Sequence, residues 1–109
     1  MKRREVVLTE HAHSDLEEIL DYIAEHDASV KADNVLRRVE AVLETLATRP
    51  ERGTYPRELV GLGIREFRQV HWKPYRVIYR IEDARVLVYV IADGRRELSV
   101  LLERRLLGS

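Results

Sequence analysis

The sequence contains no cysteine, a single tryptophan and no long apolar run. Without cysteine there can be no disulfide bridge, no thiolate nucleophile and no cysteine metal site. The apolar run near the N-terminus, Val6–Leu8, is too short for the hydrophobic region of a signal peptide. No window approaches the ~18 apolar residues of a membrane span. These absences favour a cytoplasmic protein with no membrane partner.

Familiar catalytic motifs are also missing, because the chain has no Gly-rich phosphate loop, no nucleophile elbow and no HExxH sequence. His11 and His13 are two residues apart at the start of an expected helix, so they would not share a face as metal ligands. We predict no metal and no cofactor. His71 lies beside Trp72 and near several arginines, and it is the histidine we consider as a general acid or base.

What the chain does have is charge, which makes up 35% of its 109 residues, and enough hydrophobic residues (45%) for one modest core. The net charge is zero, yet residues 1–60 carry a balance of −4 and residues 61–109 a balance of +4. An anionic partner would therefore meet the second half of the chain. The alternative is that the charge difference between the two halves is chance variation in a protein with many surface charges.

Two amphipathic helices are predicted in the first half. Apolar residues recur at helical spacing in 10–26 and again from about residue 29 to residue 49. Thr9 can cap the first helix, and either Asp27 or Ser29 the second. Since the connection is short, the helices should form an antiparallel hairpin. Both apolar stripes need a sheet or a partner to cover them.

The rest of the chain alternates as strands do, with prolines and glycines between the segments. The predicted fold class is α+β in the order β-α-α-β-β-β-α, an antiparallel sheet packed against the N-terminal helical hairpin. Its other face, or a groove at its edge, is left for arginines and a partner. The expected elements beyond the hairpin are strands 5–9, 64–70, 75–81 and 85–91, a loop over 50–63 and a helix over 97–107.

Arginines gather along the predicted strands. In the strand 75–81 alternation places Arg76 and Arg80 on one face and the tyrosines on the other. Such a set suits phosphate or carboxylate groups. The alternative is that the arginines pair with nearby acids and decorate a solvated face. Those acids are Glu66, Glu82, Asp83 and Glu97. Tyr22, Tyr79 and Tyr89 are predicted to be core or half-buried. Trp72 would stack on a base, fill an interface pocket or lie at the edge of the core.

Four stretches together resemble the RelE/ParE superfamily of toxins from type II toxin–antitoxin systems. They are LTEHAHSDLEEILDYI, RPERG, IREFRQVHWKPYRVIYRI and VYVIADGRRELSVLLERRL. The most specific part is the YRVIYRI strand followed by a strand that ends in Gly-Arg-Arg. The match runs over nearly the whole chain, so the resemblance implies one RelE/ParE-like toxin domain over residues 1–109 with the strand and helix order given above.

The resemblance implies two possible targets. RelE-like members are ribosome-dependent mRNA endoribonucleases, and ParE-like members poison DNA gyrase without catalysis. The nuclease pattern has arginines at the positions of Arg76 and Arg96, to which His71 would add an acid or base. Its lysines on the preceding strand are replaced here by Arg65 and Arg68, and its C-terminal tyrosine falls near Leu101 or Leu102. These departures favour the ParE-like branch, and so a toxin that is not an enzyme.

The resemblance also implies partners. The expected ones are a cognate antitoxin, DNA gyrase and, only through the antitoxin, operator DNA; a RelE-like nuclease would instead meet the ribosome and mRNA. Such a module inhibits growth and stabilises plasmids. A further alternative is a non-toxic remnant that only binds the antitoxin. The residues predicted to bind the target or the antitoxin are Arg65, Arg68, Trp72, Arg76, Arg80, Arg95 and Arg96.

Overall fold

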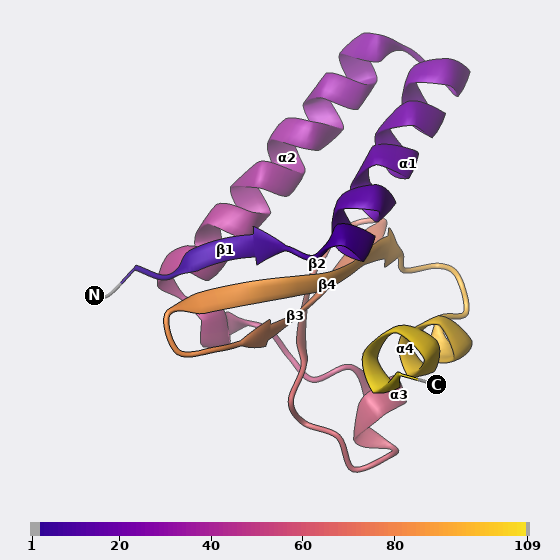
Figure 1. Ribbon diagram of the computed structural model, residues 1–109. Coiled ribbons are helices and arrows are strands. Elements are labelled where there is room, and N and C mark those ends of the chain that lie inside the picture. The colour runs from indigo at the N-terminus through magenta and orange to yellow at the C-terminus, as the bar shows by residue number, and fades with distance from the viewer. Residues whose placement is uncertain (1–2, 109) are drawn as a thin grey trace.

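A computed structural model of the chain describes residues 3–108 (Figure 1). None of the helices in this range is long and apolar enough to cross a membrane. The predicted order of helices and strands is confirmed, with two additional short helices in the predicted loop. The elements are β1 (Glu5–Leu8), α1 (Glu10–His26), α2 (Ser29–Thr48), the 3-10 turn η1 (Pro50–Arg52), α3 (Arg57–Val60), β2 (Arg68–Trp72), β3 (Tyr75–Ile81), β4 (Arg85–Asp93) and α4 (Ser99–Leu107).

The sheet has the strand order β1-β4-β3-β2. Strands β2, β3 and β4 form the predicted antiparallel meander. The sheet is not antiparallel throughout, however, because β1 lies parallel to β4, with Glu5 opposite Arg85 and Leu8 opposite Val88. Short connections fix the direction of consecutive strands, but β1 and β4 are far apart in sequence and nothing local fixes theirs. Strand β4 is central, as its apolar content predicted.

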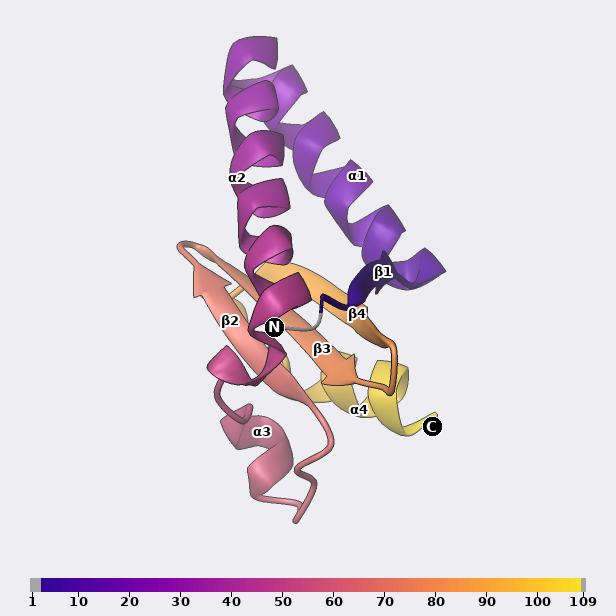
Figure 2. The ribbon, with the colours of Figure 1, turned by 90° about the vertical axis from the view of Figure 1, so that its left-hand side faces the viewer.

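The helical hairpin packs on one face of the sheet and rises beyond it (Figure 2). Its buried stripe, which includes Val39 and Leu46, meets Val77, Tyr79 and Val86 of the sheet. Thr9 caps α1 as predicted, since its hydroxyl accepts a hydrogen bond from the N–H of Ala12 at 3.2 Å. Neither Asp27 nor Ser29 caps α2. The N-cap is Ala28, which has no side-chain acceptor, and the Asp27 carboxylate pairs instead with Lys31, 3.2 Å away.

Most of the opposite face of the sheet is not open, which corrects the expectation that this face as a whole is left for arginines and a partner. The alternative, a groove at the edge of the sheet, is not contradicted. Helices α3 and α4 cover most of the opposite face (Figure 1). Leu59 of α3 and Leu102 of α4 join Ile78 and Val90 of the sheet in a second core. The sequence predicted α4 as a helix over 97–107 but did not place it on the sheet, and α3 was missed because it has only four residues. The predicted strand 64–70 begins late, at Arg68, and Phe67 just before it packs in this second core.

Candidate functional site

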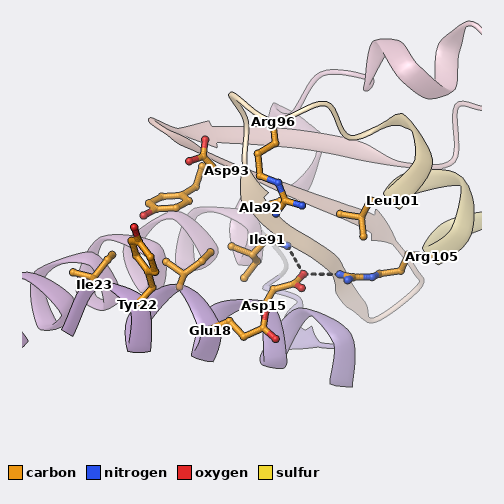
Figure 3. Close-up of a pocket in the computed structure, with 12 residues that line it drawn as sticks. Asp15, Glu18, Tyr22, Ile23, Ile91, Ala92, Asp93, Arg96, Leu101 and Arg105 are labelled. Atoms are coloured by element: carbon orange, nitrogen blue, oxygen red, sulfur yellow. Dashed lines mark hydrogen bonds and ion pairs between the residues drawn. The ribbon is translucent and has the colours of Figure 1, made fainter. Parts of the chain in front are cut away.

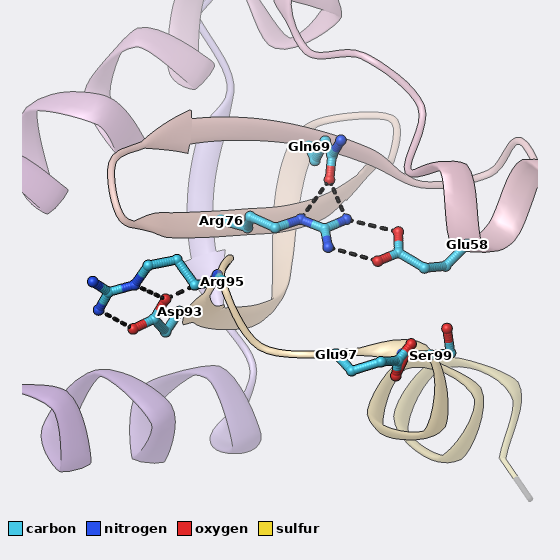
Figure 4. A network of polar contacts seen from close by, with 7 residues as sticks. All are labelled: Glu58, Gln69, Arg76, Asp93, Arg95, Glu97 and Ser99. Atoms are coloured by element: carbon cyan, nitrogen blue, oxygen red, sulfur yellow. Dashed lines mark hydrogen bonds and ion pairs between the residues drawn. The ribbon is translucent and has the colours of Figure 1, made fainter.

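Arg76 of β3 is buried, with 7% of its surface exposed. Its two terminal nitrogens donate to the two carboxylate oxygens of Glu58, at 2.7 and 2.9 Å. Its Nε and one terminal nitrogen donate to Oε1 of Gln69 on the neighbouring strand (Figure 4). These bonds use four of the five N–H donors of a guanidinium. The arginine predicted to face a partner is therefore occupied within the chain, by an acid that sequence reasoning did not name.

Gly94 makes the position of Arg76 possible. A Cβ at residue 94 would lie 2.8 Å from Cγ of Arg76 and 3.2 Å from the carbonyl oxygen of Pro74. The N–H of Gly94 donates to that same carbonyl at 2.7 Å. The glycine of the Gly-Arg-Arg sequence thus lets the chain pass close beside the aliphatic part of Arg76.

His71 lies opposite Arg76 in the register of β2 and β3, so both side chains are on the same face of the sheet. His71 is exposed, and it lines a polar pocket of about 320 Å³ with Tyr55, Arg57 and Gln69. We call this the Arg76 pocket. Its lining residues are Tyr55, Arg57, Gln69, His71, Arg76 and Gly94. Of the three candidate nuclease residues, His71 and Arg76 are therefore adjacent.

The third, Arg96, lines a different pocket of about 380 Å³ between α1, the end of β4 and α4 (Figure 3). Asp15 and Arg105 bound this pocket, and neither was predicted as a site residue. Oδ2 of Asp15 accepts from the Arg105 guanidinium at 2.5 Å and from the N–H of Ile91 at 3.0 Å. The hydrogen bond between Asp15 and Arg105 joins residues that are 90 positions apart, so no local sequence pattern could predict it. The structure does not bring Arg96 and Arg76 into one site.

A second groove of about 410 Å³ continues from this pocket, because Ile23 and Tyr75 line both. Trp72 lies here, half-buried, with its ring 5.5 Å from that of Tyr75 and the Arg38 guanidinium 5.7 Å above it. We call the two together the hairpin groove. Tyr22, predicted to be core or half-buried, is 63% exposed on its wall. Charged side chains of both signs border the groove. The basic ones are Lys31, Arg38, Arg95, Arg96 and Arg105, and the acidic ones are Asp15, Glu18, Asp27 and Asp93.

The remaining predicted binding residues have partners within the chain. Arg65 and Arg68 both lie over the ring of Tyr55, at 5.5 and 4.7 Å. Arg80 pairs with Glu82 at 2.7 Å, which is one of the ion pairs foreseen as the alternative to a binding role. Arg95 is exposed and pairs with Asp93 at 2.6 Å (Figure 4). Glu97 makes no such pair, since its carboxylate accepts from the N–H of Ser99 at the start of α4.

The ion pair with Arg76 also sets the protonation of Glu58. The hydrogen bonds from Arg76 hold the pKa of the Glu58 carboxyl below its ordinary value, against the opposing effect of burial. Because the pKa is lower in the folded state, Glu58 stabilises the fold above about pH 4.5, and this contribution is lost as the pH falls through the folded-state pKa.

A pH series therefore tests this contribution. The difference in free energy of unfolding between the wild type and Glu58→Gln is expected to be full near pH 6 and to shrink as the pH falls below about 4.5, because the unfolded wild type then binds a proton at Glu58 more readily than the folded one. Urea titrations of both proteins across this range measure it. A difference that stays constant down to about pH 3 would contradict the assignment.

The order of elements and the sheet are those of toxins from type II toxin–antitoxin systems. A chain from the structure of the ParDE system of Pseudomonas aeruginosa matches this chain with a TM-score of 0.69 and 15% sequence identity. The match covers 85% of this chain and 98% of that chain. A chain from the structure of the RelBE2 toxin–antitoxin complex of Mycobacterium tuberculosis matches with a TM-score of 0.60 and 23% sequence identity. That match covers 85% of this chain and 93% of that chain. At these identities the similarity shows the fold.

Sequence comparison defines the family more narrowly. The model of the ParE toxin of type II toxin–antitoxin systems matches residues 6–98. Toxin ParE3 of Caulobacter vibrioides is 29% identical over 100 residues, which is 92% of this chain and 96% of that protein. The chain belongs to the ParE toxin family. Membership of the superfamily and the fold were both predicted correctly from the sequence, and the family is the branch that the sequence favoured.

Proposed function

We propose that this chain inhibits growth by poisoning DNA gyrase through protein–protein contact, without catalysis of its own, as the toxin of a module that stabilises plasmids. Family membership supports the class of target, and the arrangement of the arginines supports the lack of catalysis. Cleavage through a 2′-hydroxyl needs cations on the developing phosphorane charge together with an acid and a base. Arg76 is bound to Glu58, and Arg96 lines a different pocket. The observation that carries the proposal is this separation.

The decisive experiment is a gyrase supercoiling assay with the purified chain. We expect loss of supercoiling and accumulation of cleaved DNA complexes as the protein concentration rises. Heat-denatured protein is the control. Unchanged supercoiling and no cleaved complexes at a large excess of folded protein would rule the target out.

The antitoxin is proposed to bind in the hairpin groove. The groove offers apolar and aromatic walls from Ile23, Trp72 and Tyr75. Three cations of its border pair with acids of the same groove, and the other two are Arg38 and Arg96. These features suit an amphipathic segment with acidic residues that folds on binding. The two structural relatives are themselves toxin–antitoxin systems. Operator DNA would be reached only through the antitoxin.

We expect Arg96→Glu to weaken antitoxin binding about tenfold, since a like charge at the border of the groove opposes an acidic segment. Arg104→Glu is the matched control, because it makes the same change of charge on the exposed side of α4. Titration calorimetry with a cognate antitoxin measures both. Equal affinities for the two variants would place the antitoxin elsewhere.

A RelE-like endoribonuclease is the second candidate, and the adjacency of His71 and Arg76 favours it. Its test is the mapping of mRNA cuts on translating ribosomes, where cuts that appear only with the chain would support it. The third candidate, a non-toxic remnant, requires that induced expression without the antitoxin leaves growth unchanged.

A further inference from the structure

Helix α4 is the last element of the chain and forms one wall of the hairpin groove. Leu101 and Arg105 line the groove from α4, while Asp15 and Tyr22 line it from α1 (Figure 3). On its other side α4 is attached to the sheet by Leu102, which is fully buried in the second core. The groove therefore has its complete set of walls only while α4 lies against the sheet.

One carboxylate ties α4 to the helical hairpin. Oδ2 of Asp15 accepts from the Arg105 guanidinium at 2.5 Å and from the N–H of Ile91 at 3.0 Å. The same nitrogen of Arg105 donates to the carbonyl oxygen of Tyr89 at 3.3 Å. Three elements, α1, β4 and α4, therefore meet at the Asp15–Arg105 pair. Both side chains are only 15% exposed, so the loss of one partner leaves the other poorly solvated.

The outer side of α4 is open to solvent. Val100 is 63% exposed, Leu107 is 42% exposed, and Glu103 and Arg104 between them are exposed as well. A short helix at the end of a chain, with one buried side, is the kind of element that opens locally while the rest of the fold stays intact. The Asp15–Arg105 pair acts directly on the balance between the closed and the open position of α4.

We propose that the Asp15–Arg105 pair is a latch that holds α4 closed, and that closure of α4 and antitoxin binding stabilise each other. A segment in the hairpin groove contacts α1 and α4 at once, so it binds the closed form better than the open one. The coupling is reciprocal, because groove occupancy suppresses the opening of α4 and a weaker latch lowers the affinity for the antitoxin. The coupling rests on the proposed antitoxin site, and the latch does not.

Amide hydrogen exchange in the free chain tests the latch. Asp15→Asn keeps the shape of the side chain but offers Arg105 no negative charge, so the backbone amides of α4 should exchange at least about tenfold faster than in the wild type. Asp21→Asn is the matched control, because Asp21 is exposed on α1 and the change of charge is identical. Equal exchange of α4 in the two variants would overturn the proposal.

The affinity for a cognate antitoxin separates the latch from a simple charge effect. Removal of the Asp15 charge makes the groove more attractive to an acidic segment, so electrostatics alone predicts that Asp15→Asn binds more tightly than Asp21→Asn. The latch predicts binding about tenfold weaker, because the closed form is less populated. Titration calorimetry measures both variants. Binding by Asp15→Asn that is as tight as that of the control, or tighter, would overturn the coupling.

A measurement on the wild type does not depend on the folding of any variant. A saturating concentration of antitoxin should slow the exchange of the α4 amides at least about tenfold, and unchanged exchange would overturn the coupling. If Asp15→Asn does not fold by circular dichroism, Arg105→Met takes its place in the exchange experiment, with Arg104→Met on the exposed side of α4 as its control.

Failure of the proposed function is recognised separately. A negative supercoiling result would remove gyrase as the target, and none of these measurements contains gyrase. Equal antitoxin affinities of Arg96→Glu and Arg104→Glu would remove the proposed antitoxin site. The exchange of α4 in the free chain would then still show whether the latch exists, because that experiment contains no antitoxin.

Discussion

Glu58→Ala is expected to lower the free energy of unfolding by about 3 to 5 kcal/mol, because it leaves the buried Arg76 charge without its partner. The side chains of Arg76 and Glu58 are only 8% and 12% exposed, so the remaining Arg76 charge would be poorly solvated. Gln69 retains its hydrogen bonds to Arg76 but supplies no negative charge. Urea unfolding at neutral pH measures the loss.

The double variant Glu58→Leu, Arg76→Met is the control for this interpretation. Removal of both charges avoids the cost of an unpaired buried ion, so the double variant should be more stable than Glu58→Ala alone. A double variant at least as unstable as Glu58→Ala would mean that α3 depends on Glu58 for some reason other than the Arg76 charge. The sign of this difference therefore separates lost pairing from lost packing.

Gly53→Ala is expected to lower the free energy of unfolding by about 3 kcal/mol. A Cβ at residue 53 would lie 2.3 Å from the hydroxyl oxygen of Tyr79 and 2.7 Å from the carbonyl oxygen of Gln69. Tyr79 is fully buried, and its hydroxyl accepts from the N–H of Gly53 at 3.1 Å and donates to the carbonyl of Pro50. The added methyl group forces Tyr79 away and breaks both bonds, so overpacking and unsatisfied polar groups act together.

Thermal unfolding followed by circular dichroism measures this effect. The matched control is Gly61→Ala, since a Cβ at residue 61 meets only the carbonyl oxygen of Arg57, at the ordinary distance of 3.6 Å. Gly61 has helical dihedral angles, so the control should change stability by less than about 1 kcal/mol. Equal effects at the two glycines would contradict the role of the Tyr79 hydroxyl.

Local patterns predicted most of the fold. Helical spacing of apolar residues gave α1 with its observed bounds, Glu10–His26. Alternation in β3 placed Arg76 and Arg80 on one face and Tyr79 on the other, as observed. The nearly continuous apolar stretch of β4 identified a central strand. Each of these signals is carried by neighbours in the chain, because backbone periodicity determines which side chains share a face.

Features of the structure that depend on packing were not predicted from the sequence. A bulge where β3 pairs with β4 shifts the register after Ile78. Both Tyr89 and Val90 therefore face the second core, which simple alternation forbids. The cap of α2 was misplaced because Ala28 carries no side-chain acceptor and leaves no trace in the sequence.

The sequence by itself determined the family, the element order and the face on which Arg76 lies. Only the tertiary structure decided that this face is covered, that Arg76 is bound to Glu58 and that Arg96 belongs to the hairpin groove. The tertiary structure also decided two further features, namely the parallel pairing of β1 with β4 and the ion pair between Asp15 and Arg105. The physical reason is that an arginine is suited to a carboxylate and to a phosphate alike. Which of them it meets depends on the packing of α3 and α4 against the sheet, through contacts between residues distant in the chain.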